Sequence, residues 1–228
     1  MSTKVGYFPN GDTGGRAVHS LAPAQLREAI EKSVDDLGRR PDVVFLHNPE
    51  HTLRELLAAQ ARDHLDRASI ALIEAVAAGL CGAWGIASWD PRPVADVISS
   101  DLPPAVLLLR SGLSVGAPTL AAAEKLCRTL DIPLGERWGM SPFGGSTTDP
   151  AWQAVNLASF LLDEQRASTA QIAFRLAYEL PHVTRVAVGT TRTAHLRDLV
   201  DATDLEVSAT AVRRYRELLH CRSSASGA

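Results

Sequence analysis

The sequence has little cysteine, little excess charge and no long apolar run. Its cysteines number three, an odd count without CxxC or Cys/His spacing, so neither a disulfide framework nor a metal site is supported. The net charge of −3 gives no reason to expect nucleic-acid binding. No apolar run approaches the roughly 20 residues of a membrane span, and no signal-peptide core is present. We expect a cytoplasmic protein with reduced thiols that binds neither nucleic acid nor membrane nor metal.

What is present is the composition of an ordinary globular domain. The chain has 228 residues, of which 46% are hydrophobic and 21% charged. This length suits one domain or two small ones, and no linker divides it. We expect a single domain over residues 1–219. Residues 220–228 lack apolar periodicity and are expected to form a flexible tail.

Short apolar segments alternate along the chain with longer segments of helical periodicity. We expect strands within residues 3–8, 42–47, 82–88, 105–109, 132–140 and 183–188. We expect helices within residues 20–37, 52–78 (one helix or two), 93–100, 119–130 and 169–179. Two further helices are expected to start at residues 151 and 193. Residues 9–22 form a turn-rich loop. This βαβα order fits a parallel sheet covered by helices.

Polar residues or glycine follow the predicted strands at the points where these end. They are His47, Ser88, Arg110, Ser141 and Gly189. In a barrel such strand ends converge on the face that carries the chemistry, so they favour a barrel over an open sheet. A complete eight-stranded barrel takes about 250 residues. The sequence therefore predicts an α/β fold of the TIM-barrel-like (β/α) type, incomplete or remodelled, with about six parallel strands and outer helices.

Five segments in order resemble the aldo-keto reductase superfamily. They are TKVG at 3–6, DVVFLHNPE at 42–50, GLCGAWGIASWDP at 79–91, WGMSPFGG at 138–145 and VAVGTTRTAHL at 186–196. Their order and spacing agree over most of the chain. The resemblance also implies an N-terminally shortened member, because the family's first two strands, with the catalytic aspartate and tyrosine, have no counterpart here.

Two residues match the family's lysine and histidine, Lys4 and His47. In the family, the lysine lowers the pKa of the tyrosine that protonates the carbonyl oxygen, and the histidine orients the substrate. A cation beside a phenol has this effect in general. The alternatives are that Lys4 is simply exposed and that His47 is a core histidine.

Tyr7 is the tyrosine nearest the proposed active face and could replace the missing acid. Strand alternation places Lys4 and Tyr7 on opposite faces unless the chain turns at Gly6. Otherwise Tyr7 is an ordinary packing residue. Glu50 and His51 follow in a loop, either as proton carriers or as solvated side chains.

The resemblance implies a phosphate-binding loop at the last of these segments. Gly189, Thr190, Thr191 and Arg192 would cradle phosphate before a helix. The alternative is a plain strand-to-helix turn capped by threonine. Compared with the family, the sequence therefore retains part of the site that would bind the phosphate of a cofactor.

The nicotinamide end of the cofactor site departs from the family. Ser88 and Ser141 remain as possible contacts, but Met140 replaces a stacking aromatic residue and apolar residues ending in Arg110 replace a glutamine. The sequence thus leaves two possibilities open, NADPH or no cofactor.

Four residues are candidates to bind a small-molecule substrate. Trp89 and Trp138 could wall a hydrophobic pocket, with Met140 beside them. Arg110 could bind a carboxylate or an enolate. Each of these residues has an ordinary packing or surface role as its alternative.

Three functions follow from this pattern. The first is an enzyme repurposed for non-redox acid/base chemistry, namely isomerisation, dehydration, elimination or cyclisation of a carbonyl-containing substrate, of which secondary metabolites are one class. The alternatives are an NADPH-dependent carbonyl reductase with a rebuilt acid, and a non-catalytic binding protein on the same scaffold. Because six strands leave exposed sheet edges, we also expect a homodimer.

Overall fold

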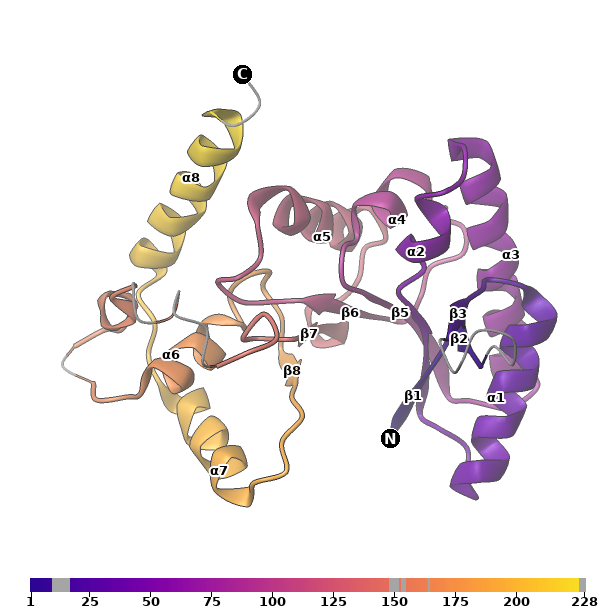
Figure 1. Cartoon of the computed structure of the whole chain (residues 1–228), viewed down its shortest axis with the longest axis horizontal. Coiled ribbons are helices and arrows are strands. Elements are labelled where there is room, and N and C mark those ends of the chain that lie inside the picture. The colour runs from indigo at the N-terminus through magenta and orange to yellow at the C-terminus, as the bar shows by residue number, and fades with distance from the viewer. Residues whose placement is uncertain (10–16, 148–151, 153–154, 164, 226–228) are drawn as a thin grey trace. The chain divides into compact units, whose positions relative to one another are not determined.

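The computed structural model describes residues 1–9, 17–147, 152, 155–163 and 165–225. They form two compact units, shown in Figure 1. Unit 1 comprises Met1–Leu109 and Lys125–Glu136, and unit 2 comprises Arg110–Glu124 and Arg137–Ala228. The single domain expected over 1–219 stays a prediction.

Unit 1 contains a parallel sheet. Its strands pair in the order β1 (Ser2–Val5), β4 (Val43–His47), β5 (Ala83–Ser88) and β6 (Val106–Arg110, whose last residue belongs to unit 2). Strands β4 and β6 are apolar runs, because a parallel sheet with covered faces leaves no side for water, whereas β1 reads STKV and buries only Val5. Fully buried side chains include Phe45, Leu46, Ile86, Leu107 and Leu109. These four predicted strands are confirmed, apart from shifts at their ends.

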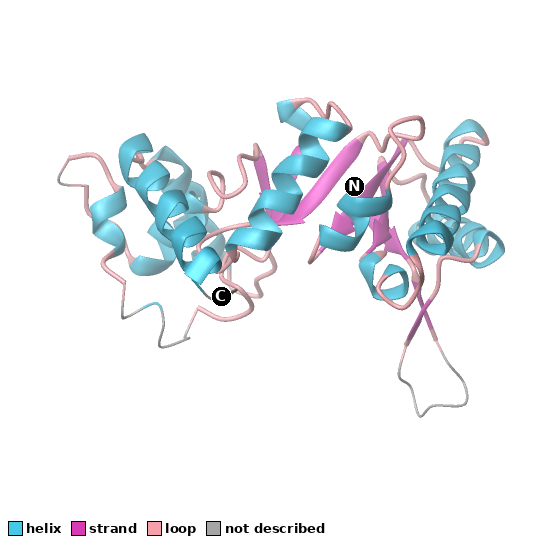
Figure 2. Cartoon of the chain, turned by 90° about the horizontal axis from the view of Figure 1, so that it is seen from above, coloured by secondary structure: helices cyan, strands magenta, loops and turns pink. Residues whose placement is uncertain are grey.

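The first predicted strand, over residues 3–8, is interrupted at Gly6. This residue has φ +134°, a backbone conformation that side-chain-bearing residues rarely adopt. Beyond it, β2 (Tyr7–Phe8) pairs antiparallel with β3 (Val18–His19), in a small ribbon separate from the parallel sheet (Figure 2). The sequence assigned β3 to a loop because two residues carry no periodicity. The loop residues 10–16 lie outside the described part of the chain.

Four helices belong wholly to unit 1. They are α1 (Pro23–Leu37), α2 (Glu50–Leu53), α3 (Ala58–Ala77) and α4 (Arg92–Val97). Helices α1 and α3 lie side by side, next to β1 and β5 (Figure 1). Helix α1 starts at Pro23 because proline, which lacks an N–H, suits the first helical position.

Unit 2 contains two parallel strands, β7 (Arg137–Met140) and β8 (Arg185–Ala187). With the four of unit 1 they make up the six parallel strands that the sequence predicts. The other α-helices of the described residues are α5 (Ala117–Thr129, shared between the units), α6 (Thr169–Leu176), α7 (Thr193–Asp201) and α8 (Ala209–Ala225). Short 3-10 turns are η1 (Leu134–Glu136), which belongs to unit 1, and η3 (Leu157–Phe160) and η4 (Ala202–Asp204) of unit 2. The core of unit 2 gathers Leu157, Phe160, Ile172, Leu176 and Leu180.

Two helical expectations in unit 2 differ from the structure. The helical segment expected from residue 151 contains η3 among its described residues, while 151 and 153–154 lie outside them. Helix α8 was not predicted, and it continues to Ala225, into the segment expected to be a flexible tail. Its few apolar positions gave no clear periodicity in the sequence.

No helix among the described residues is long and apolar enough to cross a membrane. The cysteines are free; Cys81 and Cys127 are buried and Cys221 is exposed.

Candidate functional site

Two neighbouring strands of unit 1 bring Lys4 and His47 to one face of the sheet. The parallel register pairs Lys4 on β1 with Phe45 on β4. Paired residues point the same way, and so do residues two apart on a strand, so Lys4, Phe45 and His47 share a face. Phe45 is buried there, and His47 ends β4 half-buried.

The turn at Gly6 brings Tyr7 to His47. The two rings meet edge-on, with centroids 4.8 Å apart and planes at 71°. The turn that strand alternation requires is therefore present. Gly6 also allows a close approach, because a Cβ there would lie 3.2 Å from the carbonyl oxygen of His47 and 3.3 Å from Nε2 of His19.

Two further histidines surround Tyr7. Its ring centroid lies 4.9 Å from that of His19 and 5.8 Å from that of His51. The centroids of His19 and His51 are 5.8 Å apart. The imidazole cluster consists of Tyr7 and the three histidines around it, His19, His47 and His51. They come from β2, β3, β4 and α2, so four elements of unit 1 meet at this point.

His19 is hydrogen-bonded through both ring nitrogens. Nε2 lies 2.8 Å from the backbone carbonyl oxygen of His47, and Nδ1 lies 2.7 Å from Oγ1 of Thr52. A carbonyl oxygen only accepts, so Nε2 carries a hydrogen and donates it. In the neutral ring Nδ1 then accepts the hydroxyl hydrogen of Thr52. One tautomer of His19 thus satisfies both bonds.

The surroundings lower the pKa values of the basic groups. Burial, followed by the charges of Lys4, His19 and His51, lowers the pKa of His47 from 6.5 to about 4. Burial also lowers the pKa of His19, against the effect of its bond to His47. Although Lys4 is exposed overall, loss of hydration lowers the pKa of its ammonium. His47 is consequently neutral at pH 7.

Glu50 anchors the start of α2 and is 1% exposed. Its carboxylate accepts hydrogen bonds from the hydroxyl of Ser88 (2.9 Å) and the backbone N–H groups of Trp89 (2.7 Å) and Asp90 (2.9 Å). Burial raises the pKa of Glu50, while these hydrogen bonds oppose the rise. The sequence placed Glu50 in a loop, as a proton carrier or a solvated side chain. The structure corrects this: Glu50 lies in α2, is buried and holds the turn after β5, while its role as a proton carrier stays a prediction.

The hydroxyl of Ser88 faces Glu50 rather than solvent, and its contact with a cofactor stays a prediction. Ser88 is fully buried, and its Oγ donates to Glu50. The next residue, Trp89, exposes 37% of its surface, and its contact with a substrate stays a prediction. Asp90 then accepts from Nε of Arg92 at 2.8 Å and from Arg54, which fixes the turn from the other side.

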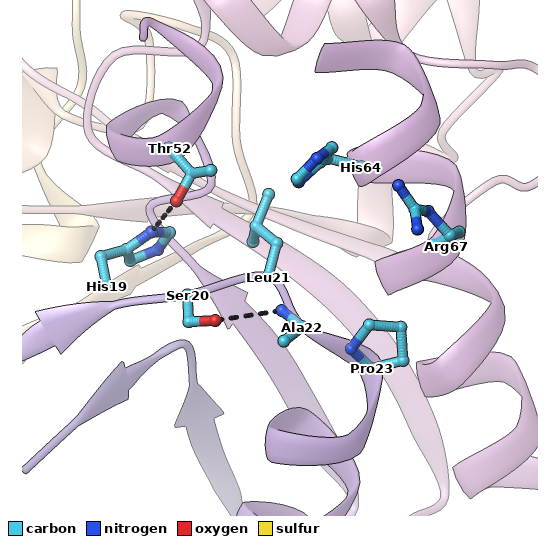
Figure 3. Close-up of a pocket in the computed structure, with 8 residues that line it drawn as sticks. All are labelled: His19, Ser20, Leu21, Ala22, Pro23, Thr52, His64 and Arg67. Atoms are coloured by element: carbon cyan, nitrogen blue, oxygen red, sulfur yellow. Dashed lines mark hydrogen bonds between the residues drawn. The ribbon is translucent and has the colours of Figure 1, made fainter. Parts of the chain in front are cut away.

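A pocket of about 290 Å³ adjoins the imidazole cluster through His19 (Figure 3). The hydrogen-bonded pair of His19 and Thr52 forms one wall, and His64 and Arg67 of α3 line the opposite side. Arg67 is also paired with Asp63 on the same helix. Apolar and small residues complete the pocket: Ser20, Leu21, Ala22 and Pro23.

Three of the candidate substrate-binding residues belong to unit 2. Arg110 is half-buried at the end of β6, and its guanidinium donates to the carbonyl of Ser114 at 3.3 Å. Met140 is 9% exposed, so it lies in the core rather than on an open wall. Trp138 lies inside β7, not at its carboxyl end, and the guanidinium of Arg185 lies 4.9 Å from its ring centroid. That Trp138 helps to wall a substrate pocket stays a prediction.

Of the proposed cofactor residues of unit 2, Ser141 is half-buried and those of the loop 189–192 are exposed. Ser141 follows β7 with φ 55°, in the left-handed region. Gly189, Thr190, Thr191 and Arg192 are exposed between β8 and α7. Oγ1 of Thr190 accepts the N–H of Arg192 at 3.1 Å, which makes a threonine-capped turn. This loop remains open to a phosphate, and phosphate binding by it stays a prediction.

The sequence matches the model of the aldo/keto reductase family over residues 1–220. This chain belongs to the aldo/keto reductase family. The resemblance inferred from five segments is thereby confirmed. No match was found among curated proteins.

Solved aldo-keto reductases share the fold. An aldo-keto reductase of Bacillus halodurans in its holo form superposes with a TM-score of 0.69 at 16% identity, over 96% of this chain and 72% of that one. Aldose reductase of Giardia lamblia gives 0.65 at 15% identity, over 96% and 71%. Glycerol dehydrogenase of Gluconobacter oxydans gives 0.64 at 15% identity, over 97% and 72%. These similarities confirm the (β/α)-barrel-like fold class and carry no information on the substrate.

Sequence reasoning missed His19 and Thr52. His19 lies in a segment that reads as a turn-rich loop, and its pairing with Tyr7 across β2 and β3 has no sequence signal. Thr52 is an ordinary helix-start residue in the sequence. Only the fold brings these side chains together.

Proposed function

We propose that this aldo/keto reductase family member catalyses non-redox acid/base chemistry on a carbonyl-containing small molecule. The observation that carries the proposal is the edge-on packing of Tyr7 on a His47 whose pKa is about 4. Lys4 lies on the same face of the sheet. A phenol, a neutral imidazole and an amine of lowered pKa are together suited to moving protons at a carbonyl compound.

Each group has a role set by its protonation state. A neutral imidazole donates an N–H hydrogen bond to a carbonyl oxygen and stabilises the negative charge that develops on it. The lowered pKa of Lys4 increases the fraction of free amine that can remove a proton from the α-carbon. The phenol of Tyr7 can return a proton. Return at a different atom gives isomerisation, and loss of a β-hydroxyl gives dehydration.

The family implies a nicotinamide cofactor, and the residues fit it only in part. The exposed loop of residues 189–192 suits a phosphate. Ser88 does not suit a nicotinamide amide, because its hydroxyl is buried and bonded to Glu50. We therefore propose no hydride transfer for this chain. This mismatch favours non-redox chemistry over reduction.

The test uses purified protein without nucleotide, in D₂O, with a panel of hydroxy ketones and β-hydroxy ketones. Proton NMR follows exchange at the α-carbon and loss of water. We expect turnover that falls about 10²–10³-fold in His47→Ala, the range for removal of one hydrogen-bond donor to a developing oxyanion. His195→Gln, an exposed histidine of α7, is the control and should keep full turnover. Equal turnover in His47→Ala and the control would contradict the proposal.

The alternative is an NADPH-dependent carbonyl reductase in which Tyr7 supplies the acid. The contact of Tyr7 with His47 and the exposed loop of residues 189–192 favour it. Titration with NADPH, followed by nucleotide fluorescence, separates the two functions. Tight saturable binding would support the reductase. No binding up to millimolar nucleotide would leave the non-redox enzyme, or a binding protein if His47→Ala changes no turnover. A cytoplasmic location stays a prediction.

A further inference from the structure

We infer that His19 is a positioning residue that sets His47 and Tyr7 in their working arrangement. The inference rests on the proposed function in one respect, because it takes the Tyr7–His47 pair as the reactive pair. His19 belongs to β3, a strand that the sequence does not reveal, and it has no counterpart among the residues implied by the family resemblance.

The first observation concerns the backbone of His47. Nε2 of His19 donates to the carbonyl oxygen of His47 at 2.8 Å. This oxygen lies where β4 ends and the chain turns at Asn48, which has φ 50°. A residue at a strand end lacks the full ladder of backbone bonds, so a side-chain donor there restricts the direction in which His47 leaves the sheet.

The second observation concerns Tyr7. The ring of His19 packs edge-on against Tyr7, with centroids 4.9 Å apart and planes at 71°. The same ring of Tyr7 meets His47 at 4.8 Å. Tyr7 is therefore held between two imidazoles, and His19 touches both members of the reactive pair.

The third observation is that His19 is itself held. Oγ1 of Thr52 lies 2.7 Å from Nδ1 and fixes the rotation of the ring. Thr52 belongs to α2, whose first residue, Glu50, is bonded to the turn after β5. His19 is thus held in place, through Thr52 and α2, by contacts with the core of unit 1. It donates to a backbone group rather than to an open site, which distinguishes positioning from direct catalysis.

The chemistry of the two nitrogens gives a matched pair of variants. In His19→Gln the side-chain amide nitrogen occupies nearly the place of Nε2 and can still donate to the carbonyl of His47. In His19→Asn the amide is one methylene shorter and reaches the place of Nδ1, which faces Thr52. Both variants are polar and uncharged, so they differ in reach and not in charge.

The test is proton NMR of the whole protein at pH 7. It records nuclear Overhauser contacts between the rings of Tyr7 and His47, and the ring-current shift of the His47 signals. Circular dichroism melting confirms that each variant is folded. We expect His19→Gln to keep the contacts and at least half of the shift. We expect His19→Asn to lose the contacts. His64→Gln, on α3, is the control and should match the wild type.

Any other result in folded protein overturns the inference. If both variants keep the contacts, His19 does not position Tyr7 and His47. If both lose the contacts, the hydrogen bond from residue 19 to the carbonyl of His47 is not what positions the pair. Should His19→Asn fail to fold, Thr52→Val takes its place, because it removes only the hydroxyl that holds the ring. That variant should reduce the ring-current shift at His47, and an unchanged shift would overturn the inference. The measurement needs no substrate or nucleotide, so its failure is distinguishable from failure of the proposed function.

Discussion

The ring of Tyr7 packs edge-on against the imidazole of His47, with 4.8 Å between the ring centroids. One residue lies just beyond the first strand and the other at the end of β4. The contact exists because Gly6 adopts φ +134° and turns the chain between Val5 and Tyr7. A straight strand would have pointed Tyr7 away from the face that Lys4 and His47 share.

Gly6 should therefore be intolerant of a side chain. In Gly6→Ala the new Cβ meets the carbonyl of His47 at 3.2 Å in a strained backbone conformation. We expect a loss of about 1–3 kcal/mol in the free energy of unfolding. Urea denaturation measures this loss. Gly135→Ala is the control, because a Cβ there meets nothing within 4 Å and φ is not positive, and its effect should be small. Equal stabilities of the two variants would refute the account of the turn.

The lowered pKa of His47 makes stability depend on pH. The unfolded chain binds a proton at His47 near pH 6.5, whereas the folded chain does so only near pH 4. The unfolded state therefore holds more protons between these values, and stability falls as the pH falls through this window. The shift corresponds to at most about 3 kcal/mol from His47. His19, whose pKa is also lowered, acts in the same direction.

The contribution of His47 is isolated by comparing the wild type with His47→Gln. The comparison is needed because the raised pKa of Glu50 acts in the opposite direction, favouring the folded state as the pH falls. Urea denaturation at pH 7, 5.5 and 4.5 should show a steeper loss of stability in the wild type than in the variant. Parallel curves would mean that His47 has an ordinary pKa.

Glu50 should contribute to stability through its hydrogen bonds. Glu50→Gln retains the size of the side chain but removes the charge and one acceptor oxygen, while Ser88, Trp89 and Asp90 still require an acceptor. We expect a loss of about 1–3 kcal/mol. Glu55→Gln, an exposed carboxylate in the turn after α2, should change stability by about 0.5 kcal/mol or less. A neutral Glu50→Gln would show that the turn after β5 is held by other contacts.

The exposed sheet edges predict a homodimer. Strands β1 and β8 stand at the two ends of the strand order. Unpaired backbone groups on such strands favour pairing with a second copy. Light scattering coupled to size-exclusion chromatography should give twice the chain mass of 24.4 kDa. A single species of chain mass across the concentration range would contradict this prediction.

Much of the fold follows from local patterns. Runs such as VVFLH at 43–47 and VLLLR at 106–110 are apolar along their length, and this marks buried parallel strands. The alternation with helical segments then gives the (β/α) order. Helix α8 and strand β3 escaped prediction because one has few apolar positions and the other has two residues.

The sequence by itself determined the family, the six parallel strands and the placement of Lys4 and His47 in two of these strands, because these depend on apolar periodicity and on short contiguous segments. Only the tertiary structure decided which side chains meet. The fold buries the hydroxyl of Ser88 against Glu50, and it brings His19 within hydrogen-bonding distance of the backbone carbonyl of His47. Both contacts link residues far apart in the chain. Their formation depends on strand register and on the backbone angle of one glycine, which residue spacing does not encode.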